Sequence, residues 1–455
     1  MEMLNAWIAA GASAVWGPWL IILLAGTHLF LTFRTGFVQR HLGHAIKLSV
    51  SRDPDAKGDI SQFGALVTAL AATIGTGNIY GVAGAIILGG PGAVFWMWLT
   101  GVFGIATKYG EALLSVKYRQ TNPQGQMCGG PMYVLQNALK ARWAGAIFAI
   151  FTALAAFGIG NMAQSDAISS MVVSQVAEFS TIDPAILKNA TGLILAAFTG
   201  LVILGGIRWI ANVCTILVPL MAALYVIGCL CIIVFNFHAI PGAISLIISS
   251  AFTGQAAIGG FVGVGIAEAM RYGVARGLFS NESGLGSAPI VAAAARTRDP
   301  VRQALVSSTG TFWDTVVVCA LTGIVLVSSG DWTKAAVVEG RDKAMLCNLA
   351  FHHIGWFGDF ILIFGLLTFV FSTILGWSYY GEKAVEYLLG IRAIFPYRIL
   401  WVAAVYVGAV WKTSAVWDFS DMMNGLMAIP NLISLLILSG VIAAETRRYF
   451  STLNP

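Results

Sequence analysis

The sequence predicts an all-α polytopic membrane protein with eleven transmembrane helices, in which two repeats follow one extra N-terminal helix. Of the 455 residues, 58% are hydrophobic and only 10% are charged, and the mean hydropathy is +0.80. Soluble domains carry about 25% charged residues, and a surface with far less charge does not stay dispersed in water. This composition excludes a soluble enzyme, a nucleic-acid-binding protein and a disordered protein.

Long apolar runs give the places of the helices. A membrane span needs about 20 mostly apolar residues. The runs are too long and too continuous for the strands of a membrane barrel, which alternate over about ten residues. Helices therefore satisfy the backbone in lipid. We expect them near residues 15–33, 61–90, 93–118, 142–176, 186–206, 209–236, 243–272, 302–329, 355–389, 396–412 and 417–444.

Basic residues give the orientation, because Lys and Arg gather on cytoplasmic loops. With eleven spans, most of the 26 Lys and Arg fall on the loops of one side. The other side carries only Lys188, Lys334, Arg341, Lys343 and Lys412. We therefore expect a multi-pass protein of the plasma membrane with its N-terminus outside and its C-terminus in the cytoplasm. The net charge of +5 then reflects topology and not a nucleic-acid partner.

Glycines interrupt two of the expected spans at mid-depth. The second span contains Ala71–Ile79 (AATIGTGNI) and the seventh contains Gly254–Gly265 (GQAAIGGFVGVG). Glycine costs about 1 kcal/mol in a helix interior, and clusters of glycine allow local unwinding that frees N–H and C=O groups. A pair of such spans indicates a transporter site built on inverted repeats. The alternative is that these glycines only let helices pack closely.

The spacing of the two interrupted spans predicts the domain organisation. They are second and seventh of eleven, so helices 2–6 and helices 7–11 form two five-helix halves of opposite topology. We expect the extra N-terminal helix and a basic cytoplasmic loop in residues 1–58. The first repeat then covers residues 59–240 and the second covers residues 241–455.

The interrupted second helix offers groups of both signs. The N–H groups of Thr76 and Gly77 would begin its second half, and a helix N-terminus suits a carboxylate. Free carbonyls at the end of the first half suit a cation, and a hard cation prefers oxygen ligands. Helix 9 offers two adjacent hydroxyls, on Ser372 and Thr373. Bonding of these hydroxyls to the preceding helical turn is the alternative.

Other polar residues inside spans are candidates for the site. Such residues are costly in lipid and usually face the bundle interior. Gln164 in helix 4 could bond a substrate amino or carboxylate group, whereas Asn161 and Asp166 are equally plausible as contacts between helices. We expect Lys108 and Glu111 to pair along one helix face.

Two long segments carry a family resemblance. Gly89–Thr107 (GGPGAVFWMWLTGVFGIAT) and Ala275–Pro289 (ARGLFSNESGLGSAP) resemble the signature stretches of the alanine or glycine:cation symporter family, also called sodium:alanine symporters. The segments TIGTGN and GNMAQ match as well, and the resemblance covers nearly the whole chain. It implies a LeuT-type fold of two inverted five-helix repeats. It also implies Na⁺-coupled uptake of small neutral amino acids such as alanine and glycine, with no organic cofactor.

The resemblance also implies the site residues. The amino-acid site would lie between helices 2, 4, 7 and 9, and the cation site would use backbone oxygens of Ala71, Ile74 and Phe369 with the hydroxyls of Ser372 and Thr373. The acidic pair Ser165-Asp166 departs from the expected pattern. The implied substrate-binding residues are Thr73, Gly75, Thr76, Gly77, Asn78, Gln164, Gly259, Gly260, Phe261, Thr373 and Trp377.

The predicted function is therefore a secondary active symporter and not an enzyme. A membrane enzyme would need converging catalytic groups, and the sequence has no H-E-x-x-H, no G-x-S-x-G and no paired carboxylates near mid-membrane. A passive channel would need charged rings or a wet path. Another neutral amino acid such as glutamine or serine, or coupling to H⁺, remains the alternative. We expect a small amino acid and membrane lipid as partners, without an obligate protein partner.

Overall fold

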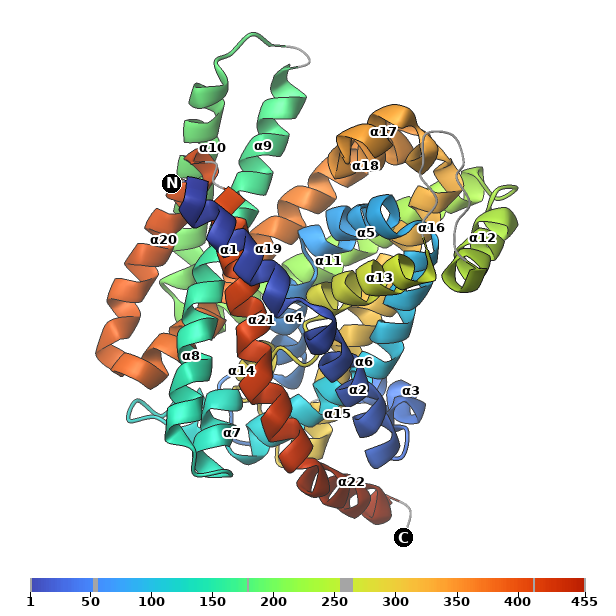
Figure 1. Cartoon of the computed structure of the whole chain (residues 1–455). Helices are drawn as coiled ribbons and strands as arrows, with labels where there is room; N and C mark the ends of the chain where they lie inside the picture. Colours follow the sequence, from blue (N-terminus) through green and yellow to red (C-terminus); the bar gives the residue numbers. More distant parts are fainter. Residues whose placement is uncertain (1, 52–55, 178–179, 254–264, 412–413, 454–455) are drawn as a thin grey trace.

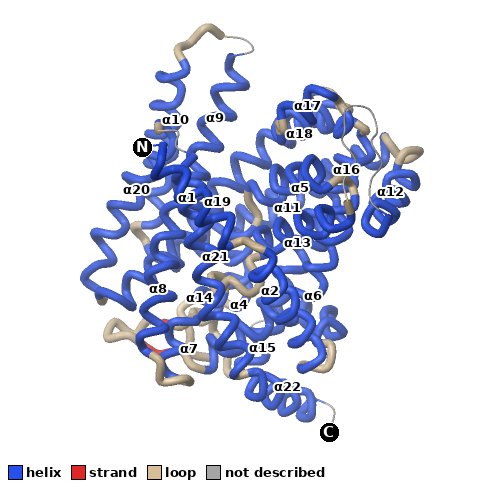
Figure 2. The backbone as a smooth tube through the Cα atoms, in the orientation of Figure 1, coloured by secondary structure: helices blue, strands red, loops and turns tan. Residues whose placement is uncertain are grey.

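The computed structural model describes residues 2–51, 56–177, 180–253, 265–411 and 414–453 (Figure 1). Nearly all of this part is helical (Figure 2). One short antiparallel ribbon joins β1 (Gln120–Thr121) to β2 (Met127–Cys128), with Gln120 opposite Cys128. The two chain ends lie at opposite ends of the molecule, where the α9–α10 hairpin and α22 project (Figure 1).

Eight helical segments of the described part are long and apolar enough to cross a membrane, or nine when one bent pair is included. The expected number of eleven is not reached by this measure. The segments that qualify are Ala6–Arg34, Arg142–Val176, Pro184–Ile203, Gly206–Phe235, Pro300–Ser329, Trp356–Leu389, Ile391–Val410 and Val416–Ile437, with Gln62–Thr73 and Gly77–Gly89 as the bent pair. Their elements are α1 (Glu2–Val15), α2 (Pro18–Arg34), α8 (Arg142–Phe157), α9 (Ala163–Ala177), α10 (Pro184–Ile203), α11 (Gly206–Phe235), α15 (Pro300–Thr311), α16 (Ala320–Ser329), α19 (Trp356–Leu389), α20 (Ile394–Val410) and α21 (Ser414–Ile437).

Helix α6 (Gly92–Lys117) matches the expected third span but is not among the qualifying segments. It carries Lys108 and Glu111, whose residues are 4% and 2% exposed. The helix packs against α2, α13 and α15. A helix enclosed by protein can carry buried polar groups that lipid would not tolerate, because neighbouring helices supply their partners.

The region of the expected seventh span, residues 243–272, contains two helices. These are α12 (Ile240–Thr253) and α13 (Ile266–Asn281). The glycine-rich interruption expected there, with Gly259, Gly260 and Phe261, lies outside the described residues. Helix α13 continues past residue 272 to Asn281 and is followed, after residues 282–288, by α14 (Pro289–Ala292). The structure therefore has a helix break that the sequence analysis did not predict.

The interruption expected in the second span is confirmed, because this span is a broken helix. Its first half is α4 (Gln62–Thr73), and its second half is a π-helical turn η2 (Gly77–Gly81) that continues into α5 (Val82–Gly89). The two halves meet at an angle of 54°. The Ser61 hydroxyl caps the start of α4 by accepting from the backbone N–H of Gly64. At Ile74 the backbone turns to an extended conformation, with ψ near 100°, which ends the first half.

The second half of the chain has three further features that bear on the site. A π-helical segment η4 (Phe312–Cys319) joins α15 to α16 and places Asp314 in the interior. The helices α17 (Ala335–Gly340) and α18 (Lys343–His352) lie between α16 and α19 in the chain. The last expected span, 417–444, is too long, because α21 ends at Ile437 and α22 (Ser439–Leu453) is a separate helix. The other short elements are η1 (Val38–His41), α3 (Leu42–Ser49), α7 (Pro131–Asn137), η3 (Gly158–Met162), η5 (Asp331–Thr333) and η6 (Ile391–Ala393).

Candidate substrate and cation site

Oxygen atoms of α4 and α19 meet where α4 ends. The Ser372 hydroxyl oxygen lies 3.2 Å from the carbonyl oxygen of Ala71 and 2.9 Å from that of Phe369. The Thr373 hydroxyl oxygen lies 3.4 Å from the carbonyl oxygen of Ile74 and 2.9 Å from that of Phe369. Both side chains are buried. All five residues expected at the cation site therefore lie together.

The expected alternative, bonding of the hydroxyls to their own helix, occurs at the same place. Each hydroxyl can donate its single hydrogen to only one of the carbonyls that it faces. Three carbonyls thus share two hydrogens, and acceptors outnumber donors in a buried cluster. A hard cation prefers such neutral oxygen ligands. Among the described residues, no group of three or more His, Cys, Asp or Glu is placed to hold a metal ion.

Glycine is required at the bend itself. A Cβ atom at Gly75 would lie 2.7 Å from the Thr373 hydroxyl oxygen. The backbone N–H of Gly75 donates to the Asn78 side-chain oxygen over 2.8 Å. The Asn78 amide nitrogen in turn donates to the Asp314 carboxylate over 2.7 Å. Asn78, expected to bind substrate, is therefore engaged in holding the bend and does not line the cavity described next.

A small cavity lies beside the bend. Seven of the expected substrate residues line it, together with three that were not expected, Phe279, Glu282 and Asn424. Gln164 is 3% exposed, and its amide nitrogen donates to the carbonyl of Ile159 while its side-chain oxygen has no hydrogen-bond partner in the described part. The expected residues in this lining are Thr73, Gly75, Thr76, Gly77, Gln164, Thr373 and Trp377.

Trp377 forms one wall of the cavity and packs against the backbone of helix η3. A Cβ atom at Gly160 would collide with the Trp377 side chain. Of the two neighbouring polar residues left open by the sequence, Asn161 donates to the carbonyl of Trp401 over 2.9 Å. Asp166 accepts from the Ser170 hydroxyl over 3.4 Å. Asn161 thus connects two helices, and neither residue lines the small cavity.

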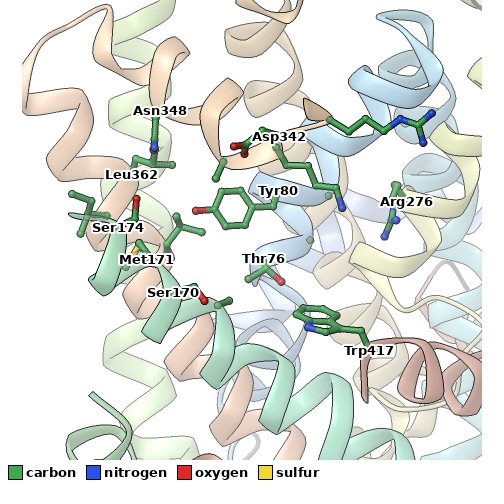
Figure 3. Close-up of a pocket in the computed structure, with 18 of the residues that line it drawn as sticks. Thr76, Tyr80, Ser170, Met171, Ser174, Arg276, Asp342, Asn348, Leu362 and Trp417 are labelled. Carbon is green, nitrogen blue, oxygen red and sulfur yellow. The ribbon is translucent and has the colours of Figure 1, made fainter. Parts of the chain in front are cut away.

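A larger cavity of about 570 Å³ begins at the same bend (Figure 3). It shares Thr76, Gly77 and Phe279 with the small cavity. Its walls come from η2, α9, α13, α18, α19 and α21, and Figure 3 shows Tyr80 and Ser170 facing its interior. The small site is therefore adjoined by a wide space on the side of α18.

The start of α4, which is the end of this helix away from the bend, is held by backbone pairing. The N–H of Asp59 donates to the carbonyl of Ala294 over 2.8 Å, and the N–H of Arg296 donates to that of Ile60 over 2.8 Å. The Arg119 guanidinium donates to the carbonyls of Ala293 and Ala295 over 2.8 and 2.7 Å, and to the carbonyl of Lys57 over 3.0 Å. These bonds join the chain before α4 to the chain after α14.

Phe279 and Glu282 were not predicted, because the sequence analysis looked for the break of the seventh span at Gly254–Gly265, most of which lies outside the described residues. Both belong to Ala275–Pro289, which the resemblance singled out without assigning a role. Glu282 ends α13 in the left-handed region, with φ of 53°, and is 4% exposed. An acidic residue between a helix and the glycines of SGLGS could have indicated a break at this point.

A multi-pass helical protein whose central cavity lies at the break of a spanning helix has the architecture of a secondary transporter. Comparison with known proteins identifies the family. The sequence model of the sodium:alanine symporter family matches residues 1–454, and the chain belongs to this family. It is thus a multi-pass membrane transporter and not an enzyme.

The relatives cover nearly the full length. The chain is 50% identical to the sodium/alanine symporter AgcS of Methanococcus maripaludis, over 96% of this chain and 95% of that protein. It is 36% identical to the probable sodium/glutamine symporter GlnT of Bacillus subtilis, over 98% of this chain and 91% of that protein.

Solved structures show the fold. The substrate-bound outward-open state of a Na⁺-coupled sialic acid symporter has a TM-score of 0.56 at 13% identity, over 91% of this chain and 86% of that one. MhsT in complex with L-phenylalanine has a TM-score of 0.50 at 14% identity, over 85% and 99% of the two chains. The expected relation to LeuT-type Na⁺-coupled transporters is confirmed at the level of the fold.

The bend generates a prediction about Gly75. Gly75→Ala should weaken the binding of Na⁺ by about 10-fold, or about 1.4 kcal/mol, because the added Cβ displaces the Thr373 hydroxyl. The measurement is the Na⁺ concentration for half-maximal amino-acid uptake in proteoliposomes. Gly81→Ala is the matched control on the same broken helix, since a Cβ at Gly81 meets nothing within 4 Å. Equal Na⁺ dependence in the two variants would contradict the prediction.

Proposed function

We propose that this protein couples inward Na⁺ movement to the uptake of small neutral amino acids, alanine and glycine, across the plasma membrane by alternating access. One observation carries the proposal. The oxygen cluster of α4 and α19 adjoins the small cavity, and Thr373 belongs to both. An ion held by Ala71, Ile74, Phe369, Ser372 and Thr373 would fix the bend that also shapes the amino-acid site. Binding of one would thereby favour the other.

The broken helix gives the substrate its orientation. The carboxylate binds at the N-terminal end of the second half, near Thr76 and Gly77, where the partial positive charge of a helix start is available. Trp377 and Phe279 close the cavity around the side chain, which favours alanine and glycine. The residues Gly259, Gly260 and Phe261, which were also predicted to bind substrate, lie outside the described residues. Asn78 stabilises the bend by accepting from the N–H of Gly75.

The proposed topology has eleven spans. The helix pair α1–α2, with the loop up to residue 58, stands outside two repeats at residues 59–240 and 241–455. The pairing of residues 58–60 with residues 294–296 supports this division, because it joins the corresponding ends of the two broken helices. Arg119 and Arg296 lie at this end, and the preference of Lys and Arg for cytoplasmic loops supports a cytoplasmic position for it, on the same side as the C-terminus. The 570 Å³ cavity then faces outside.

One Na⁺ ion is enough to drive uptake. Moving one positive charge through 100 mV is worth about 2.3 kcal/mol, and a tenfold Na⁺ gradient adds about 1.4 kcal/mol. Together these support roughly 500-fold accumulation of a net-neutral substrate.

Glutamine is the second candidate cargo, because one relative is named a probable sodium/glutamine symporter. Coupling to H⁺ is the second candidate for the ion, because another relative, 32% identical, is named a putative sodium/proton-dependent alanine carrier.

The function is tested by uptake into proteoliposomes. A panel of alanine, glycine, serine, glutamine and leucine is offered with an inward Na⁺ gradient, with an inward H⁺ gradient and with neither. Accumulation of alanine or glycine above the outside concentration only with the Na⁺ gradient supports the proposal. Equilibration without accumulation would indicate a passive channel, and accumulation driven by H⁺ alone would contradict Na⁺ coupling.

The hydroxyl cluster gives a prediction about helix α19. Ser372→Ala should raise the Na⁺ concentration for half-maximal alanine uptake about 10-fold, because one of the five oxygens is lost. Ser378→Ala is the control, since the hydroxyl of this buried serine donates to the carbonyl of Leu375 on its own helix. A Na⁺ dependence of the Ser372→Ala protein that matches the control would argue against the cation site.

The cavity wall gives a prediction about selectivity. Trp377→Ala should improve competition by leucine or glutamine against alanine uptake by about 10-fold, because the indole no longer fills the side-chain space. The readout is the inhibition constant of each amino acid in proteoliposomes. Trp356→Ala serves as control, because this tryptophan is exposed on the outside of the same helix. Unchanged competition would show that Trp377 does not limit substrate size.

A further inference from the structure

Glu282 is the one charged residue in the described lining of the small cavity. It lies at the end of α13, and its left-handed backbone is unusual for a residue that is not glycine. One carboxylate oxygen accepts from the Ser287 hydroxyl over 2.5 Å. A strained, buried carboxylate in a cavity wall needs a partner that compensates its cost.

Lys108 of α6 lies near the same helix break but does not line the small cavity. It lines a separate, very small void together with Thr73 and Asn281. Its ammonium group has no hydrogen-bond partner in the described part of the chain, so the expected pairing with Glu111 is not a hydrogen-bonded one. Lys108 instead interacts electrostatically with Glu111, Glu282 and Asp314.

The other two carboxyl groups are already bound by neutral donors. Glu111 accepts from the backbone N–H of Gly284 over 3.1 Å and from the Asn431 amide over 2.6 Å. Asp314 accepts from Asn78 and also from the hydroxyls of Ser280 and Thr315. Only Glu282 has access to the cavity, so it is the carboxylate that an entering cationic group can reach.

A second acceptor faces the same space. The Gln164 side-chain oxygen is buried without a hydrogen-bond partner in the described part, and Gln164 lines the cavity with Glu282. An α-ammonium group carries three N–H donors and needs several acceptors at once. The N-terminal end of the second half-helix meanwhile suits the carboxylate at the other end of a zwitterion.

We propose that Glu282 and Gln164 bind the ammonium group of the amino-acid substrate, and that Lys108, which lies beside the break that carries Glu282, is a positioning residue for Glu282. This inference rests on the proposed function, because it names the groups that read one end of that substrate. It assigns the recognition of the amino group to the break after α13. The requirement for an α-amino group then comes from Glu282, separately from the size limit set by Trp377.

The test compares two ligands that differ at one group. L-Lactate has the shape of L-alanine with a hydroxyl in place of the ammonium. Each is measured as a competitor of radiolabelled alanine uptake in proteoliposomes at a saturating Na⁺ concentration. The wild-type protein should prefer alanine by about 100-fold or more. In Glu282→Gln, alanine competition should weaken about 30-fold while lactate competition stays the same or improves.

Glu268→Gln is the matched control, because Glu268 is an exposed glutamate in the first turn of the same helix α13 and does not line the cavity. Its ratio of alanine to lactate inhibition should equal that of the wild type, whatever happens to the amount of folded protein. Glu282→Asp keeps the charge and should keep most of the preference for alanine. A Glu282→Gln protein with the wild-type ratio would overturn the inference, as would an Asp variant that loses the ratio as fully as Gln.

The role of Lys108 is tested by combination. Lys108→Met should reduce alanine affinity and Lys108→Arg should restore it. If Lys108 acts through Glu282, the double variant Lys108→Met/Glu282→Gln should bind alanine no more weakly than Glu282→Gln alone. Losses that multiply would contradict the positioning role. Failure of the wild-type protein to take up alanine with Na⁺ would contradict the proposed function. The ratios of alanine to lactate inhibition test only the role of Glu282.

Discussion

The structure depends on how one interrupted membrane helix satisfies the hydrogen bonds of its backbone N–H and C=O groups. Lipid offers no partner to a free N–H or C=O group, so a break at mid-depth persists only where the protein supplies one. At the bend after α4, the side-chain oxygen of Asn78 accepts from the N–H of Gly75. The carbonyls of Ala71 and Ile74 face the hydroxyls of Ser372 and Thr373. These oxygen atoms are the ligands proposed for the coupling cation.

This constraint connects parts of the chain that are far apart in sequence. Asn78 reaches Asp314 in η4, and Asp314 also binds Ser280 at the end of α13. The break after α13 is held in turn by Glu111 of α6 through Gly284. Both helix breaks thus belong to one buried polar network. The chain before α4 is joined to the chain after α14 by the backbone pairing of residues 58–60 with residues 294–296.

Much of the site could be predicted because its signals are local. Glycines and polar residues inside an apolar run mark Ala71–Ile79, and an adjacent Ser-Thr pair marks α19. The parts that were missed are set by tertiary contacts. Asn78 was predicted to bind substrate, but its side-chain oxygen accepts from the Gly75 N–H, because the backbone at the bend needs a hydrogen-bond partner. Glu282 is brought to the cavity by a left-handed residue after α13, which no periodicity indicates. The span count differs at two places: α6 carries the buried Lys108 and Glu111, and the expected seventh span contains the two shorter helices α12 and α13.

Equilibrium binding of ²²Na⁺ to the purified protein in the absence of amino acid tests the central claim most directly. The account predicts saturable binding that unlabelled Na⁺ competes and K⁺ does not, and that disappears in the double variant Ser372→Ala/Thr373→Val while the variant remains folded by circular dichroism. Undiminished ²²Na⁺ binding in that folded double variant would show that the coupling ion is held elsewhere and would contradict the account.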